Sequence, residues 1–560
     1  CIKQGQMPGH MIKEWNMKKE LTMTLAMSLV LSGAAMAQSP IPTFDKEAAT
    51  VYPYNRTGDE KTVIDEVPDD FRPGNTGTEE APAFYVKQIR LTGFPLPERD
   101  GRLSAILADY SGRSVKVDEL RTLIGRLTAY AKSCGYPVAQ AVVPPQEVKD
   151  GLLEIRMYVA SYDTVTVVKN TSDVTDSVIE GYLQRLKTGE TMTDRKLEKA
   201  INNLNDLPGV IARAVLRPGS APGTTAVDVE VMDRPVWNNY VFVDNGGGYY
   251  SGRYRYGFNL EIDNPGHQGD KIGLSGSMSS HDTDSWSARY EAPVGRDGTR
   301  LGVAYSKSEY ELNTNDFYST LGDSEGLNIY GLTPLYRDRS DRLTLIYGYD
   351  HRDIENRYRF KGLVLPELKN EKTADVWHVG ISGSQYAPNE FLQYDLIYWY
   401  GDMSTDSGDT YIDGSYQKLT GDLFKVWYDG PWNYRFRGSW QLADKPLDGS
   451  EQFYLGGMSG VRAYGNGDGY GDAGWLGSFE IRRSTGIEGL EAAVFLDGGY
   501  AKIRNGYGEH LYGWGVGLRY AMRDDWYAQL DYARKIDGRA DWAEPDDHNG
   551  RLWFQVYKMF

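Results

Sequence analysis

The residues of this chain best suited to specific chemistry are an arginine and an aspartate, each in a short motif. Arg462 lies in Val461-Arg462-Ala463-Tyr464, and Asp497 lies in Phe495-Leu496-Asp497-Gly498-Gly499. On an extended strand Phe495, Asp497 and Gly499 share one face. A guanidinium can bind a carboxylate through two parallel hydrogen bonds, most strongly where water is partly excluded. From the residues alone, two ordinary solvated charges are favoured over a pair, because most charge pairs are weak.

Other kinds of chemistry find no support in the sequence. No nucleophile beside a base, metal-ligand spacing or phosphate-binding loop is discernible, so we expect no enzyme activity, cofactor or metal. The net charge of -17 argues against a nucleic-acid partner, which requires a basic face. Cys134 is expected to be a buried small residue without a disulfide partner.

From about residue 237 to Phe560 the chain alternates apolar and polar residues. We count roughly 16 such runs, an even number typical of a single-chain outer-membrane barrel. A soluble sandwich would also alternate. Aromatic residues at the run ends and a charged polar face favour the membrane, where a closed sheet leaves no backbone group unpaired. One run carries Tyr254, Tyr256, Phe258, Leu260 and Ile262 on its apolar face, and another carries Trp514, Val516, Leu518, Tyr520 and Met522.

Ahead of the barrel, from residue 83 to about 232, two units of similar layout follow one another. Each is predicted as strand, helix, helix, strand and strand. Gly135 and Gly209 are predicted to stop the second helix of each unit, where a left-handed backbone favours glycine. The helical faces are predicted from Leu120, Ile124, Leu127 and Tyr130 in the first unit and from Leu197, Ile201 and Leu204 in the second.

The N-terminal part of the chain predicts export. Met17-Lys18-Lys19 precedes a short apolar stretch that ends at Ala35-Met36-Ala37, which together indicate a signal peptide cleaved between Ala37 and Gln38. The following residues, 38–82, are rich in proline and charge and are predicted to be a flexible leader. A disordered leader and a short helix between Asp45 and Val67 are about equally favoured.

Several further segments resemble one known family. The order of Asp244-Asn245-Gly246-Gly247, Gly252-Arg253-Tyr254-Arg255 and Asp263-Asn264-Pro265-Gly266 is similar to the first two barrel strands of the transporters of two-partner secretion. Val143-Pro144-Pro145-Gln146 resembles their first periplasmic module. The motifs around Arg462 and Asp497 match as well, although Ala463 stands where the family has glycine or a similar small residue.

The resemblance implies a 16-stranded antiparallel outer-membrane β-barrel preceded by two α+β POTRA domains in the periplasm. It implies secretion, without ATP, of a large unfolded exoprotein such as an adhesin, haemolysin or toxin. The resemblance also favours a pair over two solvated charges at Arg462 and Asp497. We then expect these two residues to clamp an inward loop to the lumen wall. The predicted regions are 1–37 for upstream residues and signal peptide, 38–82 for the leader, 83–160 and 161–234 for the POTRA domains, and 235–560 for the barrel, with its inward loop at 443–474.

We expect a monomer in outer-membrane lipid, inserted by the barrel-assembly machinery. Phe560 resembles the terminal insertion signal, although Lys558 on the same strand face departs from the usual apolar pattern. Two other functions remain open. One is a barrel-assembly insertase of the same superfamily, and the other is a porin for small solutes.

Overall fold

A computed structural model describes residues 64–66, 83–234, 239–281, 283–312, 318–338, 340–360, 368–406, 411–522, 525–536 and 547–560. Two compact units contain them, one with residues 60–234 and 267–269, and the other with residues 235–266 and 270–560. Among the described residues, no helix is long and apolar enough to cross a membrane. The predicted signal cleavage between Ala37 and Gln38 lies outside these residues.

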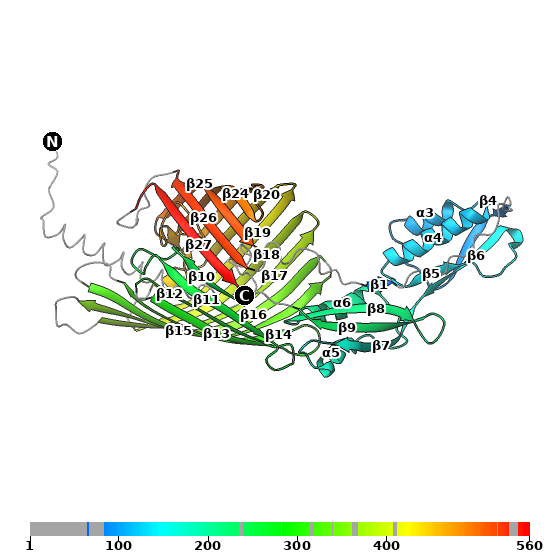
Figure 1. The fold of residues 1–560 in the computed structure, drawn as a ribbon, viewed down its shortest axis with the longest axis horizontal. Coiled ribbons are helices and arrows are strands. Elements are labelled where there is room, and N and C mark those ends of the chain that lie inside the picture. The colour runs from blue at the N-terminus through cyan, green and yellow to red at the C-terminus, as the bar shows by residue number, and fades with distance from the viewer. Residues whose placement is uncertain are drawn as a thin grey trace. The chain divides into compact units, whose positions relative to one another are not determined.

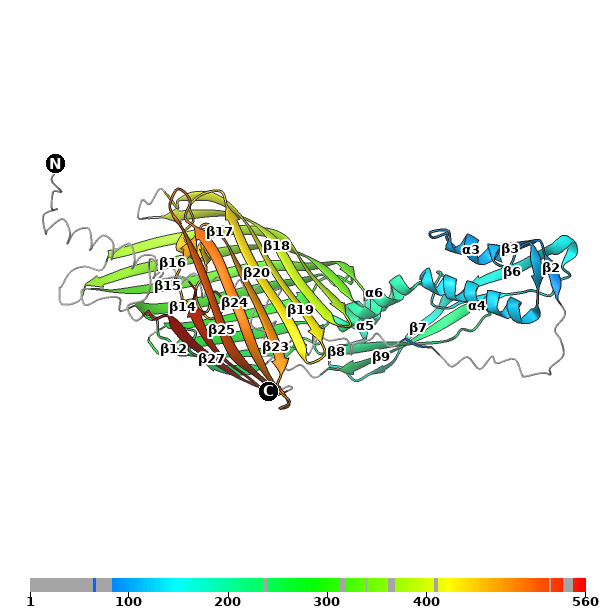
Figure 2. The same cartoon turned by 90° about the horizontal axis from the view of Figure 1, so that it is seen from above.

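The C-terminal unit is a closed barrel of 16 antiparallel strands, which confirms the predicted fold class (Figure 1). Figure 2 shows these strands lying obliquely side by side. The barrel closes where β10 (Tyr240–Asp244) pairs with β27 (Gly550–Met559). The strands between them are β11 (Arg255–Asp263), β12 (Lys271–Ser279), β13 (Thr283–Pro293), β14 (Arg300–Leu312), β15 (Tyr318–Arg337), β16 (Asp341–Phe360), β17 (Leu368–Ala387), β18 (Glu390–Thr405), β19 (Gly414–Asp429), β20 (Trp432–Ala443), β23 (Ala473–Ser484), β24 (Leu490–Lys502), β25 (Gly508–Met522) and β26 (Trp526–Lys535).

Alternation along the strands sorts apolar side chains outward and charged ones inward. On β24, Val494 and Leu496 are 52% and 55% exposed, whereas Asp497 is 1% exposed. Successive strand residues point to opposite faces, so the outward positions are those that lipid can cover. The inward positions are left for charged groups that position the functional site.

The N-terminal unit contains two α+β modules in succession. The two sheets share one pattern, β3-β6-β5 in the first module and β7-β9-β8 in the second, in which the first pair is parallel and the second pair antiparallel. A further strand, β1 (Ile64–Glu66), pairs with β8 and makes the second sheet four-stranded. Figure 1 shows α3 and α4 lying together on one side of the first module. The first module contains β2 (Phe84–Val86), β3 (Gln88–Gly93), α3 (Arg102–Ala108), β4 (Arg113–Val115), α4 (Val117–Ser133), β5 (Ala139–Val142) and β6 (Leu152–Val159), and the second contains β7 (Ser161–Asn170), α5 (Asp176–Leu183), α6 (Asp194–Asn205), β8 (Val210–Pro218) and β9 (Thr224–Asp233).

The helices pack through the apolar faces that period 3.6 predicts. In α6, Leu197, Ile201 and Leu204 are fully buried. In α4, Leu123 is fully buried while Leu120 and Ile124 are only partly buried, so the core face is rotated slightly from the predicted one. Cys134 ends α4 as a buried free thiol.

Truncating a core residue of α6 should loosen the second module without affecting the barrel. Ile201→Ala is expected to cost about 2–5 kcal/mol, because it leaves a cavity in a closed core. Hydrogen exchange on the intact chain should show faster exchange in α6 and β8 and unchanged exchange in β24 and β26. The exposed Lys199→Ala on the same helix is the control, and equal protection in both variants would contradict the packing described.

Two local predictions were wrong. Ile64–Glu66 forms a strand, β1, paired in parallel with Ala214, Val215 and Leu216 of β8, so this part of the predicted leader is neither helical nor without structure. The predicted helix at its start, near Asp45, lies outside the described residues. Gly135 directly follows the C-cap of α4 with φ 93°, as predicted, but Gly209 lies in the turn into β8, beyond the C-cap Asp206 of α6.

Candidate functional site: an inward loop tied to the barrel wall

The site is the loop between β20 and β23, the eleventh and twelfth barrel strands. It contains the 3-10 helix η2 (Gly449–Glu451) and a small hairpin of β21 (Phe453–Tyr454) and β22 (Tyr470–Gly471). Its residues between these elements pack against inward side chains of β24, β25 and β26. That cluster contains Leu455, Val461, Ala463, Tyr464, Phe495, Leu511 and Ala533, none more than 5% exposed.

Arg462 and Asp497 are in direct contact. Nε of Arg462 donates to Oδ2 of Asp497 at 2.9 Å, and Nη2 donates to Oδ1 at 2.8 Å. The backbone N–H of Arg462 donates to the same carboxylate at 3.2 Å. The Arg462 guanidinium also lies over the Phe495 ring, 3.3 Å from its centroid. This is the two-pronged geometry that arginine forms and lysine does not.

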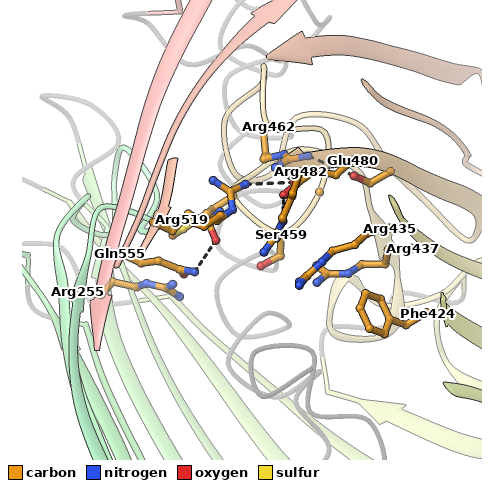
Figure 3. Close-up of a pocket in the computed structure, with 14 residues that line it drawn as sticks. Arg255, Phe424, Arg435, Arg437, Ser459, Arg462, Glu480, Arg482, Arg519 and Gln555 are labelled. Carbon is orange, nitrogen blue, oxygen red and sulfur yellow. Dashed lines mark hydrogen bonds and ion pairs between the residues drawn. The ribbon is translucent and has the colours of Figure 1, made fainter. Parts of the chain in front are cut away.

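Arg462 binds two more wall carboxylates, neither of which lies in a motif that the sequence indicates. Its Nη1 donates to Glu480 of β23 at 2.9 Å and to Asp531 of β26 at 3.1 Å. Arg519 of β25 bridges the same two carboxylates, at 3.1 Å to Glu480 and 2.5 Å to Asp531. Arg482 of β23 also pairs with Glu480. Figure 3 shows Arg462, Arg482, Arg519 and Glu480 gathered at one end of the cavity.

These three arginines and three carboxylates balance one another in charge, and Arg482 also reaches a fourth carboxylate, Glu491, at 3.8 Å. Each of the six balanced side chains is less than a tenth exposed. Buried charges are costly unless each is paired and hydrogen-bonded. The balance explains how six charged groups are accommodated together, and it makes the position of each dependent on the others.

Glycines on the wall make room for this arrangement. A Cβ at Gly517 would lie 2.0 Å from Oδ1 of Asp531 and 2.5 Å from Nη1 of Arg519, so no other residue fits there without displacing the pair. A Cβ at Gly499, the last residue of the Asp497 motif, would lie 2.7 Å from Leu455 of the loop. Gly499 thus provides the space for the loop to lie against β24.

The remaining motif residues fix the loop backbone. Trp553 of β27 donates its indole N–H to the carbonyl oxygen of Arg462 at 2.6 Å. Tyr464 is 1% exposed, and its ring lies 4.6 Å from the Lys535 ammonium. Ala463 is fully buried, and a Cβ at the facing Gly513 would lie only 2.6 Å from its methyl group. The small residue required at this position is thus supplied by alanine.

A cavity lies beside the loop, inside the barrel. Figure 3 shows Arg435 and Arg437 pointing toward it from one side and Arg255 and Gln555 lying on the other. Met458, Ser459 and Gly460 of the loop complete its lining together with the Arg462 network. Among the described residues, no cluster of histidine, cysteine and acidic side chains could hold a metal ion. The lining is polar and contains six arginines.

The last predicted site residue, Phe560, follows β27 and is 51% exposed. Its backbone N–H donates to the carbonyl oxygen of Asn239 at 3.0 Å, which extends the closing seam of the barrel. Lys558, the departure from the apolar pattern, pairs with Asp525 and lies over the Trp526 ring at 5.1 Å. The charge is therefore compensated locally.

Residues 223–520 match the model of the family described as haemolysin secretion/activation protein ShlB/FhaC/HecB. The chain belongs to this family. Residues 84–158 match the ShlB-type POTRA domain. The chain is thus an outer-membrane β-barrel transporter of secreted proteins, with its POTRA domains in the periplasm.

Individual relatives and structures agree with this assignment. The heme/hemopexin transporter protein HuxB of Haemophilus influenzae strain 86-028NP is 25% identical over 490 residues, covering 82% of this chain and 84% of HuxB. The outer membrane transporter CdiB of Dickeya dadantii strain 3937 is 24% identical over 491 residues, covering 83% and 85%. Solved structures of CdiB from Escherichia coli and Acinetobacter baumannii share the fold, with TM-scores of 0.67 and 0.66 at 20% and 18% identity; the matches cover 88% and 96% of this chain and 93% and 99% of those chains.

Proposed function

We propose that this chain exports one large exoprotein, which passes unfolded through the barrel lumen when the inward loop shifts. The observation that most directly supports this proposal is the buried ion network. It ties Arg462 of the loop to Asp497, Glu480 and Asp531 of the wall. A loop held this way inside the lumen must move for a polypeptide to pass. Arg462 and Asp497 are accordingly the clamp that sets its position.

The POTRA modules provide the docking site in this proposal. An extended segment can add a strand to an exposed sheet edge. β5 and β8 occupy equivalent positions in the two sheets, and β8 is already paired with β1, whereas β5 is an outer strand. We therefore place first contact of the exoprotein on the first module. Folding of the exoprotein outside the cell then biases movement outward without ATP.

The remaining expectations concern partners. We propose a monomer whose outward apolar residues contact outer-membrane lipid and whose Phe560 signals to the barrel-assembly machinery. The partner is expected to be a very long, repeat-rich protein with its own signal peptide, encoded in the neighbouring open reading frame. The relatives are transporters, and we propose no enzymatic activity for this chain.

Export is tested by co-expressing the neighbouring exoprotein with and without this chain and measuring the exoprotein in the medium. We expect release only when the chain is present, and equal levels of other outer-membrane barrels in both strains. A general loss of other barrels on depletion would instead support an insertase. Rapid solute uptake by liposomes, without any effect on exoprotein release, would support a porin.

A further inference from the structure

We infer that the loop carries a second anchor, of opposite charge polarity to Arg462, in which Asp448 and Glu451 hold its first part to a different arc of the barrel wall. These two loop carboxylates are paired with lysine and arginine side chains of β16, β17 and β19. They are positioning residues, and their role in export rests on the function proposed above.

The first contact of this anchor is a closed one-to-one pair. Nζ of Lys372 on β17 lies 2.5 Å from Oδ2 of Asp448, and the two side chains are 2% and 1% exposed. The other oxygen, Oδ1, accepts the backbone N–H of Ser450 at 3.0 Å. Both oxygens of Asp448 are therefore committed, one to the wall and one to the turn η2.

The second contact joins Glu451 to two cations on separate strands. Nζ of Lys418 on β19 lies 2.6 Å from Oε2, and Arg352 on β16 pairs with Oε1. All three side chains are at most 12% exposed. Gln441 of β20 also donates to the backbone carbonyl oxygen of Glu451, at 2.9 Å. Glu451 thus fastens the loop to the wall through both side chain and backbone.

Asp472 at the far end of the loop makes this segment stiff. Its Oδ1 accepts the backbone N–H of Leu447 at 2.9 Å and the side chain of Gln452 at 3.0 Å. Its Oδ2 accepts the backbone N–H of Arg504 at 2.7 Å. Asp448 and Glu451 lie between the two residues held by Oδ1, so their carboxylates are presented in a fixed position to the wall cations.

The two anchors use different strands. Arg462 is bound by β23, β24 and β26, the twelfth, thirteenth and fifteenth barrel strands, and the acidic anchor is bound by the seventh, eighth and tenth. Releasing one anchor therefore leaves the other in place. When the contacts of Arg462 with the wall break, the acidic anchor keeps the first part of the loop on the β16–β19 arc. It thereby limits how far the lumen opens.

Ion conductance of the purified full chain in planar lipid bilayers tests this directly, because it requires no exoprotein. We expect Asp448→Asn with Glu451→Gln to raise the mean conductance at least twofold. The triple variant, which combines Arg462→Ala with Asp448→Asn and Glu451→Gln, should conduct more than Arg462→Ala and more than the double variant. Asp353→Asn is the matched control, since it removes an exposed β16 carboxylate one residue from Arg352, on the opposite strand face.

A charge swap then separates pairing from simple packing. Lys372→Asp with Asp448→Lys should return conductance toward that of the unchanged chain, whereas Asp448→Lys alone should not. Folding of each variant is checked by the heat-dependent shift of barrels on gels, and if the acidic variants do not fold, Lys372→Met and Lys418→Met are used in their place. Unchanged conductance in folded variants, or a swap that does not restore it, would overturn the anchor. Neither result would affect the proposed export function, which is read from exoprotein release.

Discussion

Arg462→Ala is expected to leave the barrel folded in the outer membrane and to reduce release of the exoprotein roughly tenfold or more. The change removes the only loop charge in the network and leaves Asp497, Glu480 and Asp531 without that partner in a buried site. Removing one partner of a buried pair costs about 3–5 kcal/mol. The loop would then no longer be held in the alignment that the clamp sets for export, while the strands retain their backbone pairing.

Release of exoprotein into the medium is the measurement, normalised to folded transporter in the membrane. Arg462→Lys is the matched variant, because it keeps the charge but loses the fork that binds both oxygens of Asp497. It should give partial secretion. Full secretion by a correctly folded Arg462→Ala variant would remove Arg462 from the mechanism.

The second large effect concerns exchanging the charges of Arg462 and Asp497, which we expect not to restore secretion. Arg462→Asp combined with Asp497→Arg should remain as defective as Arg462→Ala. In an isolated pair such an exchange would preserve the attraction, but here the new aspartate at 462 would face Glu480 and Asp531, both within hydrogen-bonding distance of the present Nη1. Like charges at this separation in a buried site repel strongly.

Secretion by the swapped chain, measured beside the two single variants, checks this. The comparison is the Lys372 and Asp448 exchange, in which one cation meets one carboxylate and for which we expect the conductance of the unchanged chain to be restored. Recovery of secretion by the swap of Arg462 and Asp497 would show that Glu480 and Asp531 contribute little, and that the clamp is a simple pair.

The sequence predicted the parts of this site that depend on strand parity and local motifs. Phe495, Asp497 and Gly499 are predicted to share one strand face, and the structure places Asp497 on the inward face, opposite Val494 and Leu496. Glu480, Arg519 and Asp531 show the same signal, since each is charged and flanked on its strand by apolar or aromatic residues. The alternation of side chains along a strand predicts which face a residue occupies, but not its position along the barrel axis. That position depends on the stagger between strands, and only the structure shows that these residues are in contact.

Other features depended on contacts distant in the sequence. Ile64–Glu66 has no strand signal of its own, because its pairing comes from the edge of β8, about 150 residues further on. Asp448 and Glu451 lie within the predicted inward loop, but no sequence pattern indicates their partners, which are distant residues of β16, β17 and β19. Gly209 was misplaced because three residues, Asp206 to Pro208, separate it from the end of α6.

The most direct test of transport through the lumen is site-specific crosslinking to a stalled exoprotein. A photo-crosslinking amino acid is placed at Gln555, which lines the cavity beside the loop, or at Leu496, which faces outward and is 55% exposed. The exoprotein is arrested by fusing a rapidly folding domain to its end. Crosslinks from Gln555 but none from Leu496 are the expected result. Crosslinks from Leu496 alone, or none from Gln555 with a stalled chain bound, would contradict passage through the barrel.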